Sequence, residues 1–178
     1  MKKLLLMLFL MSALLIAMGS SAVAFKNNMS LDEIQKMAEQ GDPSAQVRLG
    51  VAYSTGTGVD ADLTKALEWY QKAADQGSPQ GQWNLAWLYV KGKGVEESYD
   101  KALELFQKAA DQGLAAAQYD LGMMHFYGMG VARSRSNALK WFHKSADQGY
   151  QQAIGFLREQ GEYTEPSAEK SEASEKAE

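Results

Sequence analysis

The feature that most constrains this chain of 178 residues is a repeat with a period of 36 residues. Glycine and leucine columns recur at that step without a single insertion. Two of these columns are Gly41, Gly77, Gly113 and Gly149, and Leu49, Leu85 and Leu121. Because a unit of this length cannot bury its apolar face alone, neighbouring units must stack on one another. The chain is therefore predicted to form an elongated array in which each unit contacts only its neighbours.

Each unit is predicted to hold two antiparallel helices. In the first helix, Ala45, Leu49 and Tyr53 recur at the i, i+4 and i+8 spacing of one helical face. Asp42 supplies an N-cap before a proline, and Gly56 ends the helix. The second helix follows a short Gly-x-Gly-Val turn and runs to the next Gln-Gly pair. The predicted fold class is all-α: a right-handed α-solenoid of antiparallel helix pairs.

The periodicity divides the chain into seven segments. They are predicted to be a signal peptide (1–24), an N-terminal capping helix (25–41), repeat 1 (42–77), repeat 2 (78–113), repeat 3 (114–149), a C-terminal capping helix (150–161) and a disordered acidic tail (162–178). The tail contains too few apolar residues to order itself. Three full repeats with a cap at each end are thus expected.

Residues 1–24 have the composition of an export signal. Two lysines precede an apolar run at residues 4–18, and Ala22-Val23-Ala24 has the small-x-small pattern of a signal-peptidase site. The run is shorter than the roughly 20 residues of a membrane-spanning helix. We therefore predict cleavage after Ala24 and a periplasmic or secreted protein, with an uncleaved anchor as the alternative.

The repeat pattern resembles the Sel-one-like repeat family, a branch of the tetratricopeptide-type helical repeats. The resemblance rests on LGVAYSTGTGVDADLTKALEWYQKAADQG at residues 49–77 and on its copies at 85–113 and 121–149. It implies an adaptor or regulator of envelope and signalling proteins. Cysteine-rich members have been discussed as acting on β-lactams, but this chain has no cysteine, so that role does not carry over.

The composition leaves little material for catalysis or metal binding. Without cysteine there is no thiol nucleophile and no thiolate metal site. The Gly-x-Gly pairs lack the rest of a phosphate loop, and Asp60-Ala61-Asp62 lacks the glycine and glutamate of a calcium loop. The net charge of −4 argues against nucleic acid as a partner. We therefore predict no enzyme, no cofactor and no metal site.

Only two histidines, His125 and His143, remain as acid–base candidates. His125 occupies a buried aromatic column and is predicted to be a core or rim histidine that makes one hydrogen bond. His143 lies on a mostly polar helix face and is predicted to be solvated. An envelope hydrolase that uses this pair is the remote alternative, because no nucleophile or orienting group accompanies them in the sequence.

Binding specificity is expected at surface positions that do not repeat. The resemblance implies that first-helix positions beside the core stripe line the concave side of the array. In repeats 2 and 3 these positions carry large apolar or aromatic side chains, the type that often dominates interfaces. The predicted partner-binding groove consists of Trp83, Trp87, Lys91, Tyr119, Met123, Phe126 and Tyr127. Arg48, Asn84 and Asp120, together with Lys91, would provide polar contacts at its margin.

The resulting hypothesis is an exported scaffold or adaptor for protein–protein interaction. It would bind a peptide or a partner protein on the aromatic-lined concave face and regulate an envelope protein. Two alternatives remain for the same side chains. They can pack between neighbouring first helices, or they can be buried in a homodimer of a self-assembling structural protein.

Overall fold

The computed structural model describes residues 29–163, and over this range the chain forms eight helices and no strand. They are α2 (Leu31–Glu39), α3 (Pro43–Thr55), α4 (Leu63–Asp75), α5 (Pro79–Lys91), α6 (Tyr99–Asp111), α7 (Ala115–Tyr127), α8 (Arg135–Asp147) and α9 (Gln151–Glu159). The predicted signal peptide and nearly all of the predicted acidic tail lie outside the described residues. The all-α solenoid that the sequence predicts is confirmed.

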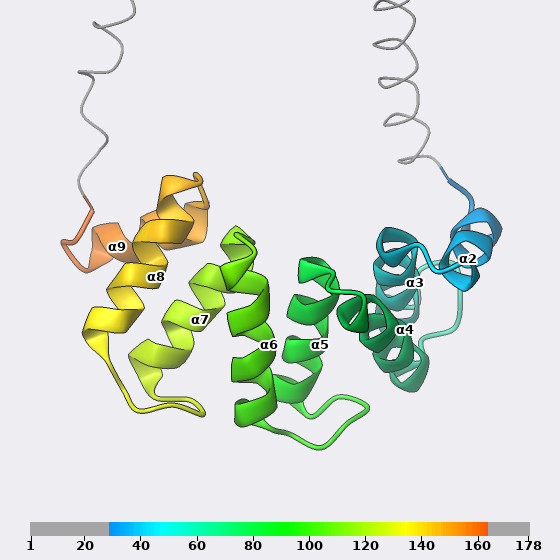
Figure 1. Ribbon diagram of the computed structural model, residues 1–178, viewed down its shortest axis with the longest axis horizontal. Coiled ribbons are helices and arrows are strands. Elements are labelled where there is room, and N and C mark those ends of the chain that lie inside the picture. The colour runs from blue at the N-terminus through cyan, green and yellow to red at the C-terminus, as the bar shows by residue number, and fades with distance from the viewer. Residues whose placement is uncertain (1–28, 164–178) are drawn as a thin grey trace, which may run out of the picture.

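The helices follow one another along an arc from α2 to α9 (Figure 1). Each helix packs on the next one along the chain, and α3 also contacts α5 directly. We call α3, α5, α7 and α9 the first helices of their units, and α2, α4, α6 and α8 the second helices. The α2 end of the arc thus begins with a second helix, whereas the α9 end finishes with a first helix.

The helix ends follow from local sequence. The Asp42 carboxylate accepts a hydrogen bond of 2.8 Å from the backbone N–H of Ala45 and caps α3. Ser78 caps α5 in the same way. The helix α3 ends at Gly56, whose φ of 72° is a left-handed conformation that glycine adopts at little cost. The third repeat lacks the N-cap signal, and α7 starts after Leu114 without a side-chain cap.

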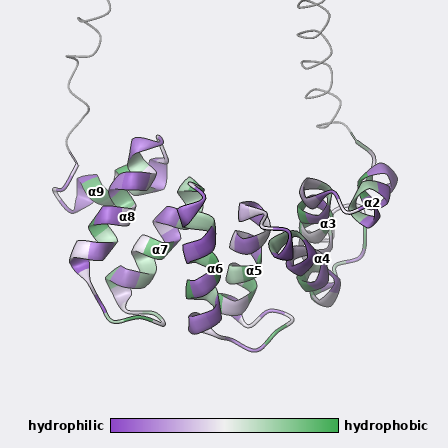
Figure 2. Cartoon of the chain, viewed as in Figure 1, coloured by the Kyte–Doolittle hydropathy of each residue, from purple (hydrophilic) through white to green (hydrophobic). Residues whose placement is uncertain are grey.

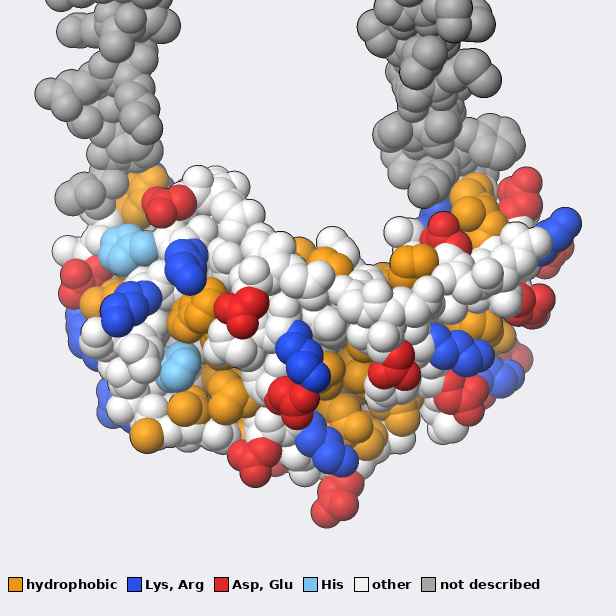
Figure 3. Space-filling model, viewed as in Figure 1, with side chains coloured by type: hydrophobic (Ala, Val, Ile, Leu, Met, Phe, Trp, Pro, Cys, Tyr) orange, Lys and Arg blue, Asp and Glu red, His pale blue; other side chains and the backbone are white. Residues whose placement is uncertain are grey.

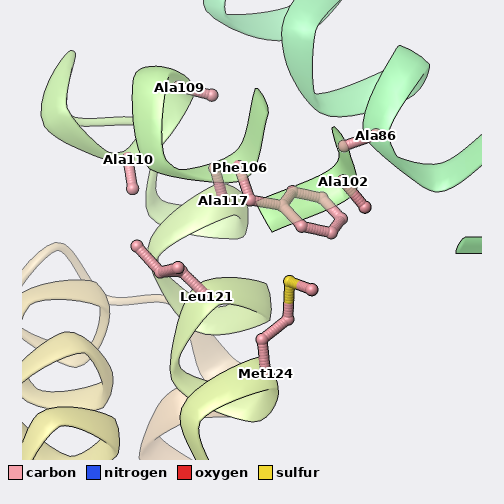
Figure 4. Packing of buried hydrophobic residues seen from close by; sticks show 8 residues of the cluster. All are labelled: Ala86, Ala102, Phe106, Ala109, Ala110, Ala117, Leu121 and Met124. Carbon is pink, nitrogen blue, oxygen red and sulfur yellow. The ribbon is translucent and has the colours of Figure 1, made fainter. Parts of the chain in front are cut away.

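The core lies between the two layers of helices, and hydrophobic and hydrophilic residues are mixed on the helices (Figure 2). In the middle of the arc the Phe106 ring lies among Ala86, Ala102 and Met124 (Figure 4). Small residues on the first helices allow such close packing. A Cβ atom placed on Gly50 would lie 2.6 Å from the Tyr70 ring. We call the column formed by Gly50, Ala86 and Gly122 the small-residue column, because each member lies beneath the ring of a second helix.

A ladder of glutamines joins the units inside the stack. The buried side-chain oxygens of Gln46, Gln82 and Gln118 accept hydrogen bonds of 2.7, 2.9 and 2.7 Å from Gln76, Gln112 and Gln148 respectively. Gln46 and Gln118 also donate to carbonyls of the preceding second helix. The amides of Gln46 and Gln118 therefore tie their first helix to the second helices on both sides of it, and Gln82 is joined to Gln112 at the end of α6.

Two residues assigned to the acidic tail are part of the folded end. The Glu162 carboxylate lies 3.1 Å from the Arg135 guanidinium, and the Tyr163 ring lies 5.0 Å from the guanidinium of Arg158. Tyr163 also packs against the core cluster of α8 and α9. These contacts hold residues 162 and 163 against the last helices, because the single aromatic of the predicted tail finds an apolar surface.

None of the helices in residues 29–163 combines the length and apolar character that a membrane span requires.

Candidate interaction face on the first helices

The predicted groove residues come from two neighbouring first helices. Trp83, Trp87 and Lys91 lie on α5, one helical turn apart, and the other four lie on α7. The structure joins the two groups through Asp120, which lies on α7 opposite α5. We call the surface formed by these residues the first-helix face.

Asp120 is the polar centre of this face. One carboxylate oxygen, Oδ2, accepts hydrogen bonds from the indole Nε1 atoms of Trp83 at 2.6 Å and Trp87 at 2.9 Å. Burial raises the pKa of this carboxyl group to about 6, although the two indole donors and the charge of Lys91 act in the opposite direction. Asp120 therefore holds α5 and α7 together. The sequence predicted a different role, that of a polar contact at the margin of the groove.

The aromatic side chains on α7 pack against residues of α8 and of the α9 end of the stack. The Tyr119 ring lies 5.6 Å from the ring of Phe142 and 5.7 Å from that of Tyr150, between centroids. The Phe126 ring lies 5.2 Å from the Phe156 ring in an edge-to-face arrangement. Met123 joins the same cluster. Packing between neighbouring first helices thus accounts for part of the surface of these side chains.

The face nevertheless keeps apolar surface exposed to solvent. Trp83, Trp87, Tyr119, Met123 and Phe126 are all half-buried. Tyr127 is 59% exposed and stacks edge-on against Phe126. Hydrophobic side chains reach the surface of the arc between charged ones (Figure 3). Tyr127 is therefore the side chain of the predicted set that stands out furthest from the packed interior.

A small pocket adjoins the face between α3 and α5. Its volume is about 180 Å³, and Trp87, Asn84 and Leu88 line one side. The Ser54 hydroxyl lies 3.3 Å from the Tyr70 hydroxyl on the opposite side. Two cations, Lys91 and Lys93, also line it, and the Lys91 ammonium lies 4.9 Å from the centre of the Trp87 ring. The pocket thus offers hydroxyl, amide and ammonium groups beside an aromatic surface.

The histidines form no catalytic arrangement with other groups of the described chain. Nδ1 of His125 is buried without a hydrogen-bond partner in residues 29–163, and burial lowers the pKa of this imidazole. The sequence predicted one hydrogen bond for this side chain, and Nδ1 does not make it within the described residues. His143 is exposed, as expected. Over the same range, no three histidine or acidic side chains come close enough to hold a metal ion.

Stacked helix pairs with a partly exposed aromatic face define a helical-repeat scaffold. A family model described as the Sel1 repeat matches residues 43–78, 79–114 and 115–150. The chain therefore belongs to the Sel1 repeat family, whose members are scaffolds for protein–protein interactions.

Solved structures agree with this assignment. The protective antigen c5321 of uropathogenic Escherichia coli strains, which displays an SLR fold, is 36% identical with a TM-score of 0.69. The match covers 75% of this chain but only 29% of the length of that protein. A Sel1 repeat protein from Oxalobacter formigenes is 35% identical with a TM-score of 0.66, over 72% of this chain and 97% of the other.

Cysteine rich protein B of Helicobacter pylori shares the fold alone, with 22% identity, a TM-score of 0.60 and coverage of 71% and 94% of the two chains. A search of the curated proteins found no match.

Proposed function

We propose that this protein is an exported scaffold that binds a segment of a partner protein along its first-helix face and so regulates an envelope protein. One observation supports the proposal above all: large apolar side chains stay partly exposed on neighbouring first helices although the stack buries their inner edges. Partly exposed aromatic groups of this kind dominate the energetics of many interfaces, because they bury a large area with few rotatable bonds.

The chemistry of the face indicates the type of segment that it binds. An apolar side chain of the partner packs between Trp87 and Tyr127, and an acidic side chain or a chain end lies near Lys91 and Lys93. Oδ2 of Asp120 already accepts hydrogen bonds from both indoles, so its role in this proposal is to hold Trp83 and Trp87 in place. The expected partner segment is therefore apolar with a negative charge at one end.

Site-specific crosslinking tests the proposal without disturbing the core. The full chain is expressed with a photoreactive phenylalanine analogue at the position of Tyr127 or, as a control, at that of exposed His143 on a second helix. We expect crosslinks to an envelope protein from position 127 only. The combination Tyr127→Ala with Lys91→Ala should weaken binding of that protein, whereas Glu104→Ala with Lys108→Ala on α6 should leave it unchanged.

Equal crosslinking from both positions, or equal binding by both double variants, would contradict the assignment of the face. A dimer mass in light scattering that returns to the monomer mass in Tyr127→Ala would show that the face mediates self-assembly instead. Truncation of Trp83 is a poor test, because it also removes a hydrogen bond from Asp120.

Export is tested separately by cell fractionation and by mass spectrometry of the purified protein. The proposal expects the protein in the periplasm or the medium, with Phe25 as its first residue. A cytoplasmic protein that retains residues 1–24 would contradict export and leave the binding face to be judged on the crosslinking alone.

A further inference from the structure

The α2 end of the arc contains an apolar cleft that belongs to no part of the first-helix face described above. Its volume is about 440 Å³, and it is lined mainly by Leu31 and Ile34 from α2 and by Val47, Val51 and Ala52 from α3. Val51 is 40% exposed, which is unusual for a large apolar side chain in this structure. Arg48 is the one charged residue among those that line the cleft.

The cleft marks the place of a first helix that no segment of residues 29–163 supplies. One period further along, Tyr70, Trp87 and Leu88 stand where the cleft has Ile34, Val51 and Ala52. There the helix α3 covers the site, and its Ser54 hydroxyl contacts the Tyr70 hydroxyl. Only about 180 Å³ of open space remains in that interior site, compared with about 440 Å³ at the end. The end cleft therefore has the position and lining of a helix-binding slot.

At the opposite end of the arc, α9 lacks two of the residue types that the interior first helices use for stacking. In the glutamine ladder, position 154 carries isoleucine, and in the small-residue column position 158 carries arginine. An arginine at that position stands where each interior unit needs a small residue beneath a second helix. If α9 of a second copy entered the cleft, it would place Arg158 against Ile34. A second copy of this chain is thus a poor occupant.

The interior interface between α5 and α7 shows which charge the occupant should carry. Asp120 corresponds to Arg48 two periods earlier, and it receives N–H donors from two positions on the preceding first helix. Arg48 has the opposite hydrogen-bonding character to Asp120. Its guanidinium donates hydrogen bonds, whereas the Asp120 carboxylate accepts them. An incoming helix should therefore present an acceptor, best a carboxylate, where α5 presents Trp87. Residues 1–28 of the chain contain three lysines and no acidic residue, so they do not supply this group.

We propose that this cleft is a second binding site, which takes an acidic amphipathic helix from a partner protein. The bound helix completes the first unit of the stack. It places a glycine or alanine against Ile34, apolar side chains on Val47 and Val51, and a carboxylate against Arg48. This mode is helix-in-groove recognition, and it is independent of the first-helix face.

A pair of designed peptides tests the site. The probe is a helix-stapled peptide that copies residues 41–56 with Val51→Glu, and the matched control carries Val51→Lys. The peptide copies α3, which fills the corresponding interior slot, and stapling is needed because a helix this short is marginal in water. Binding is measured by fluorescence anisotropy to protein purified from cells that express the full chain. We expect the glutamate peptide to bind about tenfold more tightly than the lysine peptide.

Variants of the cleft make the result specific. Arg48→Glu should reverse the preference of the protein for the two peptides, and Val51→Trp, which fills the cleft, should abolish binding of both. Circular dichroism checks that each variant keeps its helices. Absence of binding, equal binding of the two peptides or an unchanged preference in Arg48→Glu would overturn the proposal. A protein dimer that the peptide dissociates would also overturn it, because a second copy would then be the occupant.

Discussion

The two ends of the arc solve the same physical problem differently. At the α9 end, Ile154 replaces the ladder glutamine and Arg158 replaces the small residue that each interior unit needs. Tyr163 and Glu162 then fold back onto the last helices. At the α2 end, Ile34 keeps its place in the aromatic column of the second helices and packs against α3, but no first helix precedes α2 within residues 29–163. Within residues 29–163 the array is thus closed at the α9 end and open at the α2 end.

This difference teaches how a solenoid stops. A repeat unit adds to the stack when its neighbour offers a small residue, a ladder glutamine and an apolar surface. Changing two of these positions ends the stack at α9, whereas keeping the apolar surface at α2 leaves a cleft. Positions in the interior of the stack should therefore respond to substitution differently from their counterparts toward its ends.

The largest effect is expected from truncation of the leucine column. Leu85→Ala in the interior should lower the free energy of unfolding by about 2–5 kcal/mol, because it leaves a cavity between two units. The corresponding Leu157→Ala on the last helix should cost only about 1–2 kcal/mol, since the end can relax. Both side chains are fully buried, so their burial alone does not separate them. Urea denaturation provides the comparison, and equal losses would contradict it.

The second-largest effect is expected from Asp120, the interior counterpart of Arg48, whose titration makes the stability of the protein depend on pH. Its pKa in the folded protein is about 6, above the ordinary value of 3.8, so the folded state holds the proton more tightly than the unfolded state. The stability from this group is therefore present at pH 4 and is lost as the pH rises through 6. At about 1.4 kcal/mol per pKa unit, the loss approaches 3 kcal/mol by pH 7.

Asp120→Asn removes this titration and isolates its effect. The stability of the variant relative to the native protein should increase by about 2–3 kcal/mol between pH 4 and pH 7. Asp100→Asn, at an exposed position, is the matched control and should show no such change. Parallel pH profiles for the native protein and Asp120→Asn would contradict the burial of this carboxyl group.

Two glycine substitutions should have opposite signs. Gly122→Ala would place a Cβ 2.7 Å from the Phe142 ring, and separating the helices should cost about 1–3 kcal/mol. Gly155→Ala on α9 meets nothing within 4 Å and should stabilise the protein by up to about 1 kcal/mol through helix propensity. Thermal unfolding measures both. A loss of stability in Gly155→Ala would show that α9 has a neighbour on that side.

The smallest effect concerns the folded-back end. Truncation after Tyr163 should leave the melting temperature unchanged. Truncation after Gly161 also removes the Glu162 ion pair and the Tyr163 ring contact, and should cost about 0.5–1 kcal/mol. Calorimetry of the two truncated chains distinguishes them. Identical melting temperatures would mean that the α9 end is closed by Ile154 and Arg158 alone.

Much of the fold was predictable because it depends on short-range chemistry. The capping of α3 by Asp42 and its end at Gly56 involve residues within one turn of each other. Lys72 and Lys144 lie in the last turns of α4 and α8, where a cation suits the helix dipole, and each also lies over a ring, that of Trp69 or of Trp141. A period that repeats three times then extends each local inference to the whole stack.

The candidate sites were predictable only in part. The aromatic positions on α5 and α7 stand out in the sequence because they vary where other columns repeat. The half-burial of these side chains cannot be read from the sequence, because it depends on residues one unit away, such as Phe156 and Tyr150. The bond between Trp83 and Asp120 joins residues 37 positions apart, and a helical period within one segment does not reveal it.

The sequence by itself determined the helices, their order and the family of this protein, because each depends on patterns within one 36-residue unit. The tertiary structure was needed to decide which side chains remain exposed, where the glutamine ladder runs and which end of the stack is open within residues 29–163. These properties arise from contacts between helices that lie far apart in the sequence. Trp83 and Asp120 are 37 positions apart, and Gln46 and Gln76 are 30 positions apart, so the pattern of one helix does not reveal their contacts.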